Sequence, residues 1–253
     1  MDQDSTSPES EVRKLEGNAV HLWWMWAGEG EEPGPEREWL SAAESRRSEA
    51  FRSDQDRRAF ELRRGFLRAL LASYTGRDPA ELVLEEDEFG KPHLPSTSLS
   101  FNVSHSGDAI LVALADAREV GADVERHGHE EWLDGLAAHF FDPTEREELE
   151  STEPDRLTET FFRGWARKEA LLKALGVGFL SDPRRFFVGL GEAPPGRVWA
   201  PADPLVGGFG AVADLETPPG YAAAVAAAGC GWHPEVRGRF RGWSEALRAL
   251  RAA

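Results

Sequence analysis

The stretch SLSFNVSHSGDAILVALADAREVGADVE, residues 98–125, decides the fold class. Apolar and polar residues alternate in its first part, and His105, Ser106 and Gly107 turn the chain before the next apolar run. Alternation of this kind predicts strands, and residues 109–125 are expected to form a hairpin. A sheet is therefore expected in the middle of the chain.

Helices and strands are predicted on both sides of this stretch. Toward the amino terminus, the pattern predicts a strand at 21–27 and helices at 36–51 and 56–74, the last capped by Asp54 or Asp56. Toward the carboxyl terminus, it predicts helices at 130–141, 144–150 and 155–175, strands at 184–190, 196–200, 208–215 and 220–228, and an amphipathic helix after Pro234. Gly76 and Gly176 are expected to end the two long helices. The order of elements favours a mixed α+β fold.

The similar order of elements in the two halves favours two subdomains of one kind. Residues 1–19 are polar and acidic and are expected to form a disordered leader. The two expected subdomains then comprise residues 20–125 and 126–253.

Composition limits the possible functions. A chain of 253 residues that is 41% hydrophobic can bury a real core. One cysteine, Cys230, excludes an internal disulfide and a multi-cysteine zinc site, and it favours a reducing cytoplasmic location. The sequence has neither a membrane-spanning apolar run nor the pattern of a signal peptide. The formal net charge of -16 disfavours nucleic-acid binding, so an anionic ligand needs a local basic pocket.

The segment VGADVE, residues 120–125, carries two carboxylates. In a strand, Asp123 and Glu125 share one face, while the apolar residues occupy the other. Two carboxylates about 7 Å apart repel each other unless a cation lies between them, and hard oxygen ligands suit magnesium. The alternative is the solvated face of an edge strand, which needs no cation.

Glu169 falls inside the apolar stripe of the predicted helix 155–175. At about 100° per residue it projects between Phe162 and Trp165, where an unpaired carboxylate is costly to desolvate. Lys173, one turn later, is a candidate partner in an ordinary i, i+4 pair. Lys168 also lies in the stripe and is expected to extend its ammonium to solvent.

Ser104 and His105 lie at the end of a predicted strand, close to Gly107. Hydroxyl and backbone donors at a tight turn, with an imidazole beside them, suit a phosphate; ordinary turn chemistry is the alternative. Lys91 precedes a proline that holds it extended, so it either reaches the same site or lies on the surface.

Arginines form the main basic concentration in this acidic chain, and they are Arg52, Arg57, Arg58, Arg63 and Arg64. Such a cluster can hold the terminal phosphate of a nucleotide, and part of it is expected to be a solvated helix face.

Four motifs occur together: FGKPHL (89–94), FNVSHSGD (101–108), VGADVE (120–125) and WARKEALLKALGVGF (165–179). In this order they resemble the phosphopantetheinyl transferases of the surfactin-synthetase-activating type. The resemblance implies a monomer of two α+β subdomains related by a pseudo-twofold axis, with coenzyme A in the cleft between them. It also implies magnesium-dependent transfer of phosphopantetheine from coenzyme A to a serine of an acyl- or peptidyl-carrier protein.

The same resemblance assigns roles to individual residues. Asp123, Glu125 and Glu169 would be the magnesium ligands, and Lys173 would lie against the coenzyme A phosphates. The implied coenzyme A contacts are Lys91, Ser104 and His105, with Arg58 and Arg52 on the 3'-phosphate. Glu145 in FFDPTERE matches the acidic residue that is thought to deprotonate the serine, directly or through water. Ala166 stands where the family usually has threonine, so a hydroxyl role is absent there.

In the implied reaction, the carrier serine attacks the β-phosphate of coenzyme A and expels 3',5'-bisphosphoadenosine. Glu145 or Glu169 would take the serine proton, and Lys173 would stabilise the leaving group. Apolar residues after Gly128 are candidate carrier contacts. Two other functions stay open on the residues alone: a magnesium-dependent phosphohydrolase that uses the same carboxylates, and a non-enzymatic acidic adaptor. The adaptor leaves the inward Glu169 unexplained.

Overall fold

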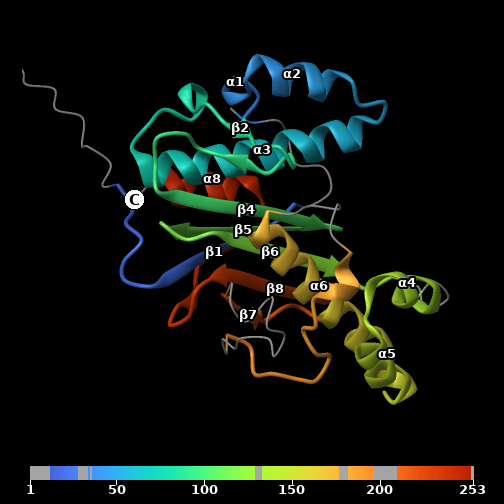
Figure 1. The fold of residues 1–253 in the computed structure, drawn as a ribbon. Coiled ribbons are helices and arrows are strands. Elements are labelled where there is room, and N and C mark those ends of the chain that lie inside the picture. Colours follow the sequence, from blue (N-terminus) through green and yellow to red (C-terminus); the bar gives the residue numbers. More distant parts are fainter. Residues whose placement is uncertain are drawn as a thin grey trace, which may run out of the picture. The chain divides into compact units, whose positions relative to one another are not determined.

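The computed structural model describes residues 12–27, 34, 36–128, 133–176, 182–196 and 210–251. Helices and strands are mixed, which confirms the α+β class (Figure 1). The chain forms two compact units that interleave in sequence. None of the described helices is long and apolar enough to cross a membrane.

The first unit contains residues 25–83 and the described parts of both chain ends, 12–14 and 240–251. Its helices are α1 (Glu36–Trp39), α2 (Ala42–Glu49), α3 (Asp54–Thr75), the short 3-10 helix η1 (Pro79–Glu81) and α8 (Trp243–Arg251). Helix α3 contacts the other four. It buries Phe66, Leu70 and Leu71 completely, so this unit has an apolar helical core.

Helix ends in this unit depart from the prediction in two places. The predicted helix at 36–51 is two helices, because Ser41 begins α2 with a capping box that includes Glu44. Ser53, and not Asp54 or Asp56, caps α3. Gly76 ends α3 in the left-handed conformation, with φ 67°, as predicted.

The second unit, residues 15–24 and 84–239, contains the sheets. One sheet has the order β4 (Leu99–Ser106), β5 (Ala109–Asp116), β1 (Ala19–Trp26) and β9 (His233–Phe240). The other has the order β6 (Val120–Arg126), β8 (Tyr221–Ala228) and β7 (Gly210–Asp214). The short strands β2 (Glu85–Glu86) and β3 (Pro92–His93) pair with each other.

The predicted hairpin over residues 109–125 is wrong. Strand β5 pairs with β4 across the Gly107 turn, whereas β6 pairs with β8 in the other sheet. Between β5 and β6, Ala117 adopts the left-handed conformation, with φ 48°, and the chain leaves the first sheet there. The carboxylates of β6 therefore belong to a different sheet from Ser104.

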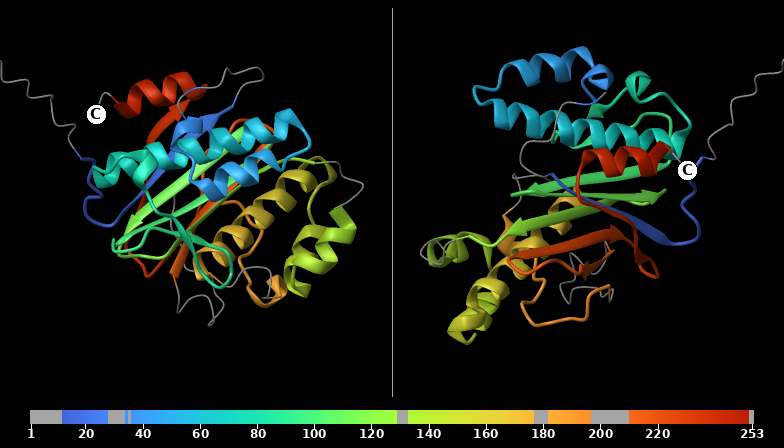
Figure 2. Two further views of the ribbon diagram at one scale, coloured as in Figure 1. Left: turned by 90° about the horizontal axis from the view of Figure 1, so that it is seen from above. Right: turned by 180° about the vertical axis from the view of Figure 1, so that it is seen from behind.

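The helices of the second unit are α4 (Leu133–Phe140), α5 (Pro143–Glu150) and α6 (Leu157–Leu175), with 3-10 turns η3 (Pro154–Arg156) and η5 (Pro183–Arg185). Helix α6 packs against β6 and β8, and α4 and α5 contact α6 (Figure 2). Ala166, Ala170 and Ala174 of α6 are buried against the alanines of β8. Small side chains on both sides allow the helix to approach the sheet closely.

Other predicted strands have mixed outcomes. Residues 208–215 and 220–228 contain β7 and β8 as predicted. The strand predicted at 184–190 is wrong, because side chains of α5 and α6, instead of a neighbouring strand, bind its backbone. All but the first residue of the strand predicted at 196–200 lie outside the described residues. Residues 233–240 form the unpredicted strand β9, so the closing helix begins only at Trp243.

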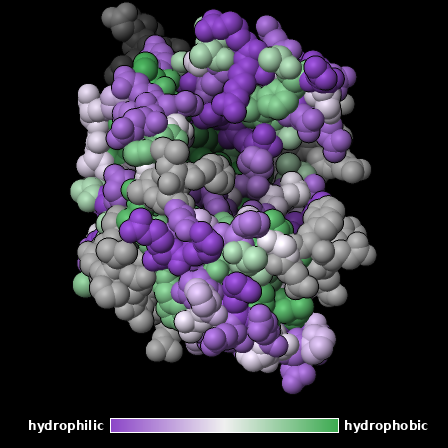
Figure 3. Space-filling view, turned by 45° about the vertical axis from the view of Figure 1, so that its right-hand side comes forward, coloured by the Kyte–Doolittle hydropathy of each residue, from purple (hydrophilic) through white to green (hydrophobic). Residues whose placement is uncertain are grey.

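The surface agrees with the composition. Figure 3 shows hydrophilic side chains over much of the visible face, with hydrophobic side chains in small groups. This polar surface fits a chain in which 29% of the residues are charged.

Candidate active site

Asp123 is a buried carboxylate on β6, with 1% of its surface exposed. Its Oδ1 accepts hydrogen bonds from Lys173 Nζ at 2.5 Å and from Ser104 Oγ at 2.8 Å. Its Oδ2 is buried and has no hydrogen-bond partner among the described residues. A buried carboxylate oxygen of this kind needs a partner, and a cation is one that satisfies it.

Glu125 lies two residues further along β6 and is partly buried. Ser106 Oγ donates a hydrogen bond to its Oε2 at 2.8 Å. Burial, followed by the negative charge of Asp123, raises the pKa of Glu125 to about 7. The Lys173 and Glu169 charges also act on it, so these groups share one site.

Glu169 and Lys173 reach this site from α6. Burial is the main cause that raises the pKa of Glu169, and the charge of Asp123 adds to it, while Lys173 opposes it. The structure therefore brings Asp123, Glu125, Glu169 and Lys173 together. Strand β6 is an edge strand of its sheet, as the predicted alternative had it. The solvated face is wrong, because α6 packs against β6 and Asp123 is buried.

Gly121 explains how α6 comes so close. A Cβ atom at this position would lie 2.1 Å from the carbonyl oxygen of Ala170 and 2.3 Å from the nitrogen of Ala174. Only a residue without a side chain allows this contact. Gly121 was not assigned a role from the sequence, although it precedes Asp123 by two residues on the same strand face.

The cluster has the oxygen donors that a divalent cation would need. It contains three carboxylates and one ammonium, with raised pKa values at two carboxylates and an unpartnered oxygen on the third. Oxygen ligands on rigid elements are what magnesium prefers. As they stand, however, no three His, Cys, Asp or Glu side chains among the described residues are arranged closely enough to hold a metal ion. A magnesium site at Asp123, Glu125 and Glu169 therefore stays a prediction.

The predicted phosphate contacts of the second unit lie near the same strands. The hydroxyl of Ser104 is buried and is engaged by Asp123, Val124 and Lys173. His105, next along β4, is exposed. Lys91 Nζ pairs with Glu119 Oε2 at 2.7 Å, immediately before β6 begins.

The predicted arginines lie in the first unit. Arg52 is exposed. Arg58 is ion-paired with the fully buried Glu36 and lies 3.7 Å from Glu61. Their contact with the 3'-phosphate stays a prediction.

Glu145, the predicted base, pairs with Lys168 and not with the cluster around Asp123, and its role in the reaction stays a prediction. It is fully buried, and it completes the capping box of α5 with Asp142. Its Oε1 accepts from the Val188 backbone, and its Oε2 pairs with Lys168 Nζ at 2.6 Å. The prediction that Lys168 extends to solvent is wrong, because Lys168 is fully buried and also donates to the carbonyls of Pro183 and Phe186.

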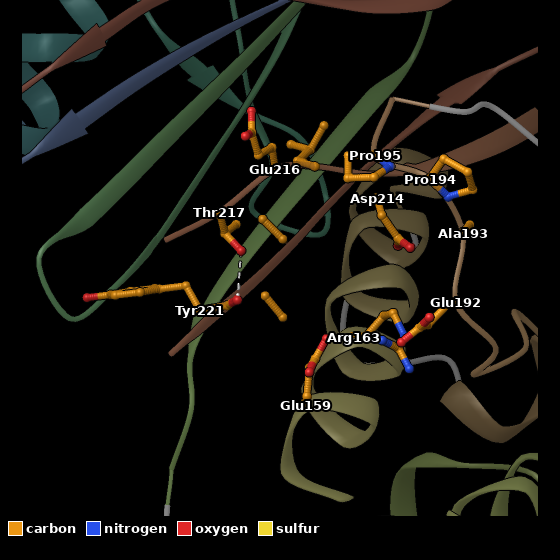
Figure 4. Close-up of a pocket in the computed structure, with 13 residues that line it drawn as sticks. Glu159, Arg163, Glu192, Ala193, Pro194, Pro195, Asp214, Glu216, Thr217 and Tyr221 are labelled. Atoms are coloured by element: carbon orange, nitrogen blue, oxygen red, sulfur yellow. Dashed lines mark hydrogen bonds and ion pairs between the residues drawn. The ribbon is translucent and has the colours of Figure 1, made fainter. Parts of the chain in front are cut away.

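A cavity of about 640 Å³ elsewhere in this unit contains none of the predicted site residues. Its lining residues, drawn in Figure 4, include Glu159 and Arg163 of α6 together with Glu192 and Asp214. Asp214 forms a bidentate ion pair with Arg167, at 2.8 and 2.6 Å. Since this carboxylate already has its partner, the cluster around Asp123 is the better candidate site.

Comparison with known proteins identifies the family. Residues 119–199 match the 4'-phosphopantetheinyl transferase superfamily, and residues 26–117 match the N-terminal region of 4'-phosphopantetheinyl transferases. The chain is 33% identical over 241 residues to 4'-phosphopantetheinyl transferase HetI of Nostoc sp., which covers 93% of this chain and 98% of that protein. It is 35% identical over 113 residues to a 4'-phosphopantetheinyl transferase of Bacillus subtilis, which covers 44% of this chain and 49% of that protein.

The buried carboxylates and lysine fit an enzyme that acts on phosphate esters. The chain belongs to the 4'-phosphopantetheinyl transferase family. It transfers the 4'-phosphopantetheine group of coenzyme A to a serine of an apo carrier protein.

Proposed function

We propose that Asp123, Glu125 and Glu169 bind Mg²⁺ during this transfer. The observation that carries the proposal is the buried Asp123 Oδ2, which has no hydrogen-bond partner among the described residues. The raised pKa values of Glu125 and Glu169 support it, since burial and then the charge of Asp123 disfavour their ionised forms, and a cation would compensate both effects. When bound, magnesium would neutralise charge on the phosphate oxygens of coenzyme A.

Lys173 and Glu169 are proposed to act directly on the reaction. The carrier serine oxygen forms a bond to the β-phosphorus of coenzyme A, and the bond to the 3',5'-bisphosphoadenosine oxygen breaks. Lys173, which reaches into the cluster beside Asp123, would stabilise the charge that develops on the leaving phosphate. Glu169, which lies in the same cluster, would accept the serine proton.

Glu145 is less suited to be that base. Both of its carboxylate oxygens already accept hydrogen bonds, and its side chain is fully buried. A general base must come within hydrogen-bond reach of the proton it takes. We therefore favour Glu169 for this role.

Lys91 and His105 are proposed to contact the coenzyme A phosphates. His105 is exposed between Ser104 and Ser106, the two serines that contact the carboxylates. Ser104 has less freedom for such a contact, because Asp123, Val124 and Lys173 already use its hydroxyl.

For the 3'-phosphate, Arg63 is a stronger candidate than Arg58. Arg58 already pairs with buried Glu36, whereas Arg63 is partly buried and forms no ion pair with a described residue. Burial and the charges of Arg64 and Arg47 lower the pKa of Arg63, so an anion beside it would be favoured. Arg52 stays in the proposal as an exposed outer contact.

The finer family assignment is also a proposal. The four sequence motifs support the surfactin-synthetase-activating type, with two related subdomains, a division near residue 125, a coenzyme A cleft and a monomeric enzyme. The partners would be acyl- or peptidyl-carrier proteins of fatty-acid, polyketide or nonribosomal-peptide synthesis. A single exposed cysteine, Cys230, is compatible with a cytoplasmic location.

A carrier panel tests the proposal. The enzyme is incubated with coenzyme A, Mg²⁺ and several apo carrier proteins, and mass spectrometry detects the phosphopantetheine adduct on serine. We expect an adduct that chelation abolishes and that Glu169→Gln greatly reduces. An adduct that survives both treatments would contradict the proposed metal site, and free phosphopantetheine without a carrier would indicate hydrolysis instead.

A further inference from the structure

Strands β4 and β6 belong to different sheets but are joined by side chains. The side chains of three alternate residues of β4 accept hydrogen bonds from the backbone N–H groups of alternate residues of β6. The bonds run from Ala122 to Asn102 Oδ1 at 3.0 Å, from Val124 to Ser104 Oγ at 3.3 Å, and from Arg126 to Ser106 Oγ at 3.0 Å. These side chains thus set the register between β4 and β6, as backbone hydrogen bonds do between neighbouring strands of one sheet.

Two of these three side chains also donate to a carboxylate. Ser104 Oγ donates to Asp123 Oδ1, and Ser106 Oγ donates to Glu125 Oε2, each at 2.8 Å. A hydroxyl has one proton to give and two lone pairs with which to accept. Because the backbone N–H group fixes each serine oxygen on one side, the hydroxyl proton is directed toward the carboxylate. Asn102 makes the backbone contact, and its side chain has no hydrogen bond to a carboxylate of the described residues.

We propose that Ser106 is a positioning residue for Glu125, as Ser104 is for Asp123, so that one serine orients each carboxylate of β6. This inference depends on the proposed function, in which these carboxylates bind the metal. A hydrogen bond to one oxygen of a ligand carboxylate fixes its rotation and leaves the other oxygen for the cation. Glu125 needs this support because it is only partly buried and its longer side chain has more rotamers to lose.

The experiment measures metal binding without turnover. Mn²⁺ serves as the probe, and the free ion is counted by electron paramagnetic resonance in the full-length enzyme without a carrier protein. Ser106→Ala should weaken Mn²⁺ binding by about tenfold, the lower end of the effects seen when a residue that orients a ligand is removed. Ser106→Thr retains the hydroxyl and suits a strand, so its affinity should lie within roughly threefold of that of the parent enzyme.

Asn102→Ala is the matched control. It removes the equivalent side-chain contact to the β6 backbone but no contact to a carboxylate. We expect it to lower the melting temperature while leaving Mn²⁺ affinity within about twofold of that of the parent. If Asn102→Ala weakened Mn²⁺ binding as much as Ser106→Ala, strand register would explain the effect, and the positioning role would be wrong.

The same titration separates the two proposals. If the parent enzyme binds Mn²⁺, Asp123→Asn abolishes binding and Ser106→Ala binds normally, the role of Ser106 is wrong while the metal site stands. If the parent enzyme binds no Mn²⁺ with or without coenzyme A, the metal site itself is wrong. Failure of Ser106→Thr to restore the affinity lost in Ser106→Ala would also overturn the role of the hydroxyl.

Discussion

Lys168 and Glu169 are neighbours on α6, yet they enter two buried clusters of opposite character. Lys168 pairs with Glu145, so that cluster has one positive and one negative group, and its ammonium donates to two carbonyls as well. Glu169 joins Asp123 and Glu125, with Lys173 as the cation that acts on all three. We call Lys168 with Glu145 the balanced cluster. Asp123, Glu125, Glu169 and Lys173 form the unbalanced cluster, which has an excess of negative charge.

The difference distinguishes a cluster that stabilises the fold from the cluster that is the proposed reaction site. A buried pair whose donors and acceptors are all used fixes the chain, and here it holds residues 183–188 against α5 and α6. A cluster with repelling carboxylates and an unpartnered oxygen destabilises the protein unless a ligand compensates it. Unsatisfied buried charge is therefore the better sign of a functional site.

Breaking the balanced cluster should have the largest effect on stability. Lys168→Met leaves Glu145 buried without its cation, and the free energy of unfolding should fall by about 3–5 kcal/mol. Adding Glu145→Gln removes the uncompensated charge and should recover part of this loss. Urea unfolding of the parent, the single and the double variant measures both effects, and a loss below about 1 kcal/mol for Lys168→Met would contradict the structural role.

Breaking the unbalanced cluster should affect catalysis instead. Asp123→Asn should lower the transfer rate by about 10²–10³-fold, because a carboxylate that supports charge on the phosphates is lost. Its effect on stability in chelator should stay below about 1 kcal/mol, since reduced repulsion offsets the lost contact with Lys173. Mass spectrometry measures the transfer rate. If Asp123→Asn lowered the free energy of unfolding as much as Lys168→Met does, the distinction between the clusters would be wrong.

A substitution at Gly121 tests whether the close approach of α6 to β6 creates the unbalanced cluster. Gly121→Ala places a methyl group against the backbone of α6, and it should cost about 1–3 kcal/mol and reduce transfer. Gly135→Ala in α4 is the control, since its methyl group meets no described atom within 4 Å apart from its chain neighbours and the backbone of its own helix, and it should stabilise the helix slightly. Thermal unfolding and a transfer assay measure both variants. Equal melting temperatures and equal transfer rates for the two variants would contradict the prediction.

The smallest expected effect is a pH dependence. The pKa of Glu125 is raised to about 7, so the folded protein binds this proton more tightly than the unfolded chain does. The contribution of Glu125 to stability is then greatest below about pH 4.5 and is lost as the pH rises through about 7. In chelator, Glu125→Gln should reduce this decline by about 1 kcal/mol after solvent screening is considered. The check is the free energy of unfolding of the parent and of Glu125→Gln between pH 5 and pH 8. The same dependence on pH in both proteins would contradict the prediction.

The sequence predicted much of the unbalanced cluster, because local periodicity was sufficient. Alternation in VGADVE assigned Asp123 and Glu125 to one face, and helical spacing assigned Glu169 and Lys173 to the same side of a helix. The long helices and their terminal glycines were also predictable, since Gly76 and Gly176 both adopt the left-handed conformation. These features depend on residues that are neighbours along the chain.

The sequence did not predict the balanced cluster or the strand partners. Lys168 was expected in solvent, because nothing local indicates that α5, α6 and residues 183–188 meet around it and Glu145. The pairing of β6 with β8 joins residues that are at least 95 positions apart, and β9 lacks the buried alternation that reveals a strand. Which charges find partners depends on such long-range contacts.

The sequence by itself determined the family, the α+β class and the residue types of the site, since motifs and periodicity are written in neighbouring positions. Only the tertiary structure decided that Glu145 is balanced by Lys168, that Gly121 admits α6, and that Ser104 and Ser106 each hold a carboxylate of β6. The physical reason is that burial and charge compensation depend on which elements meet in space. Adjacent residues such as Lys168 and Glu169 can therefore have opposite roles.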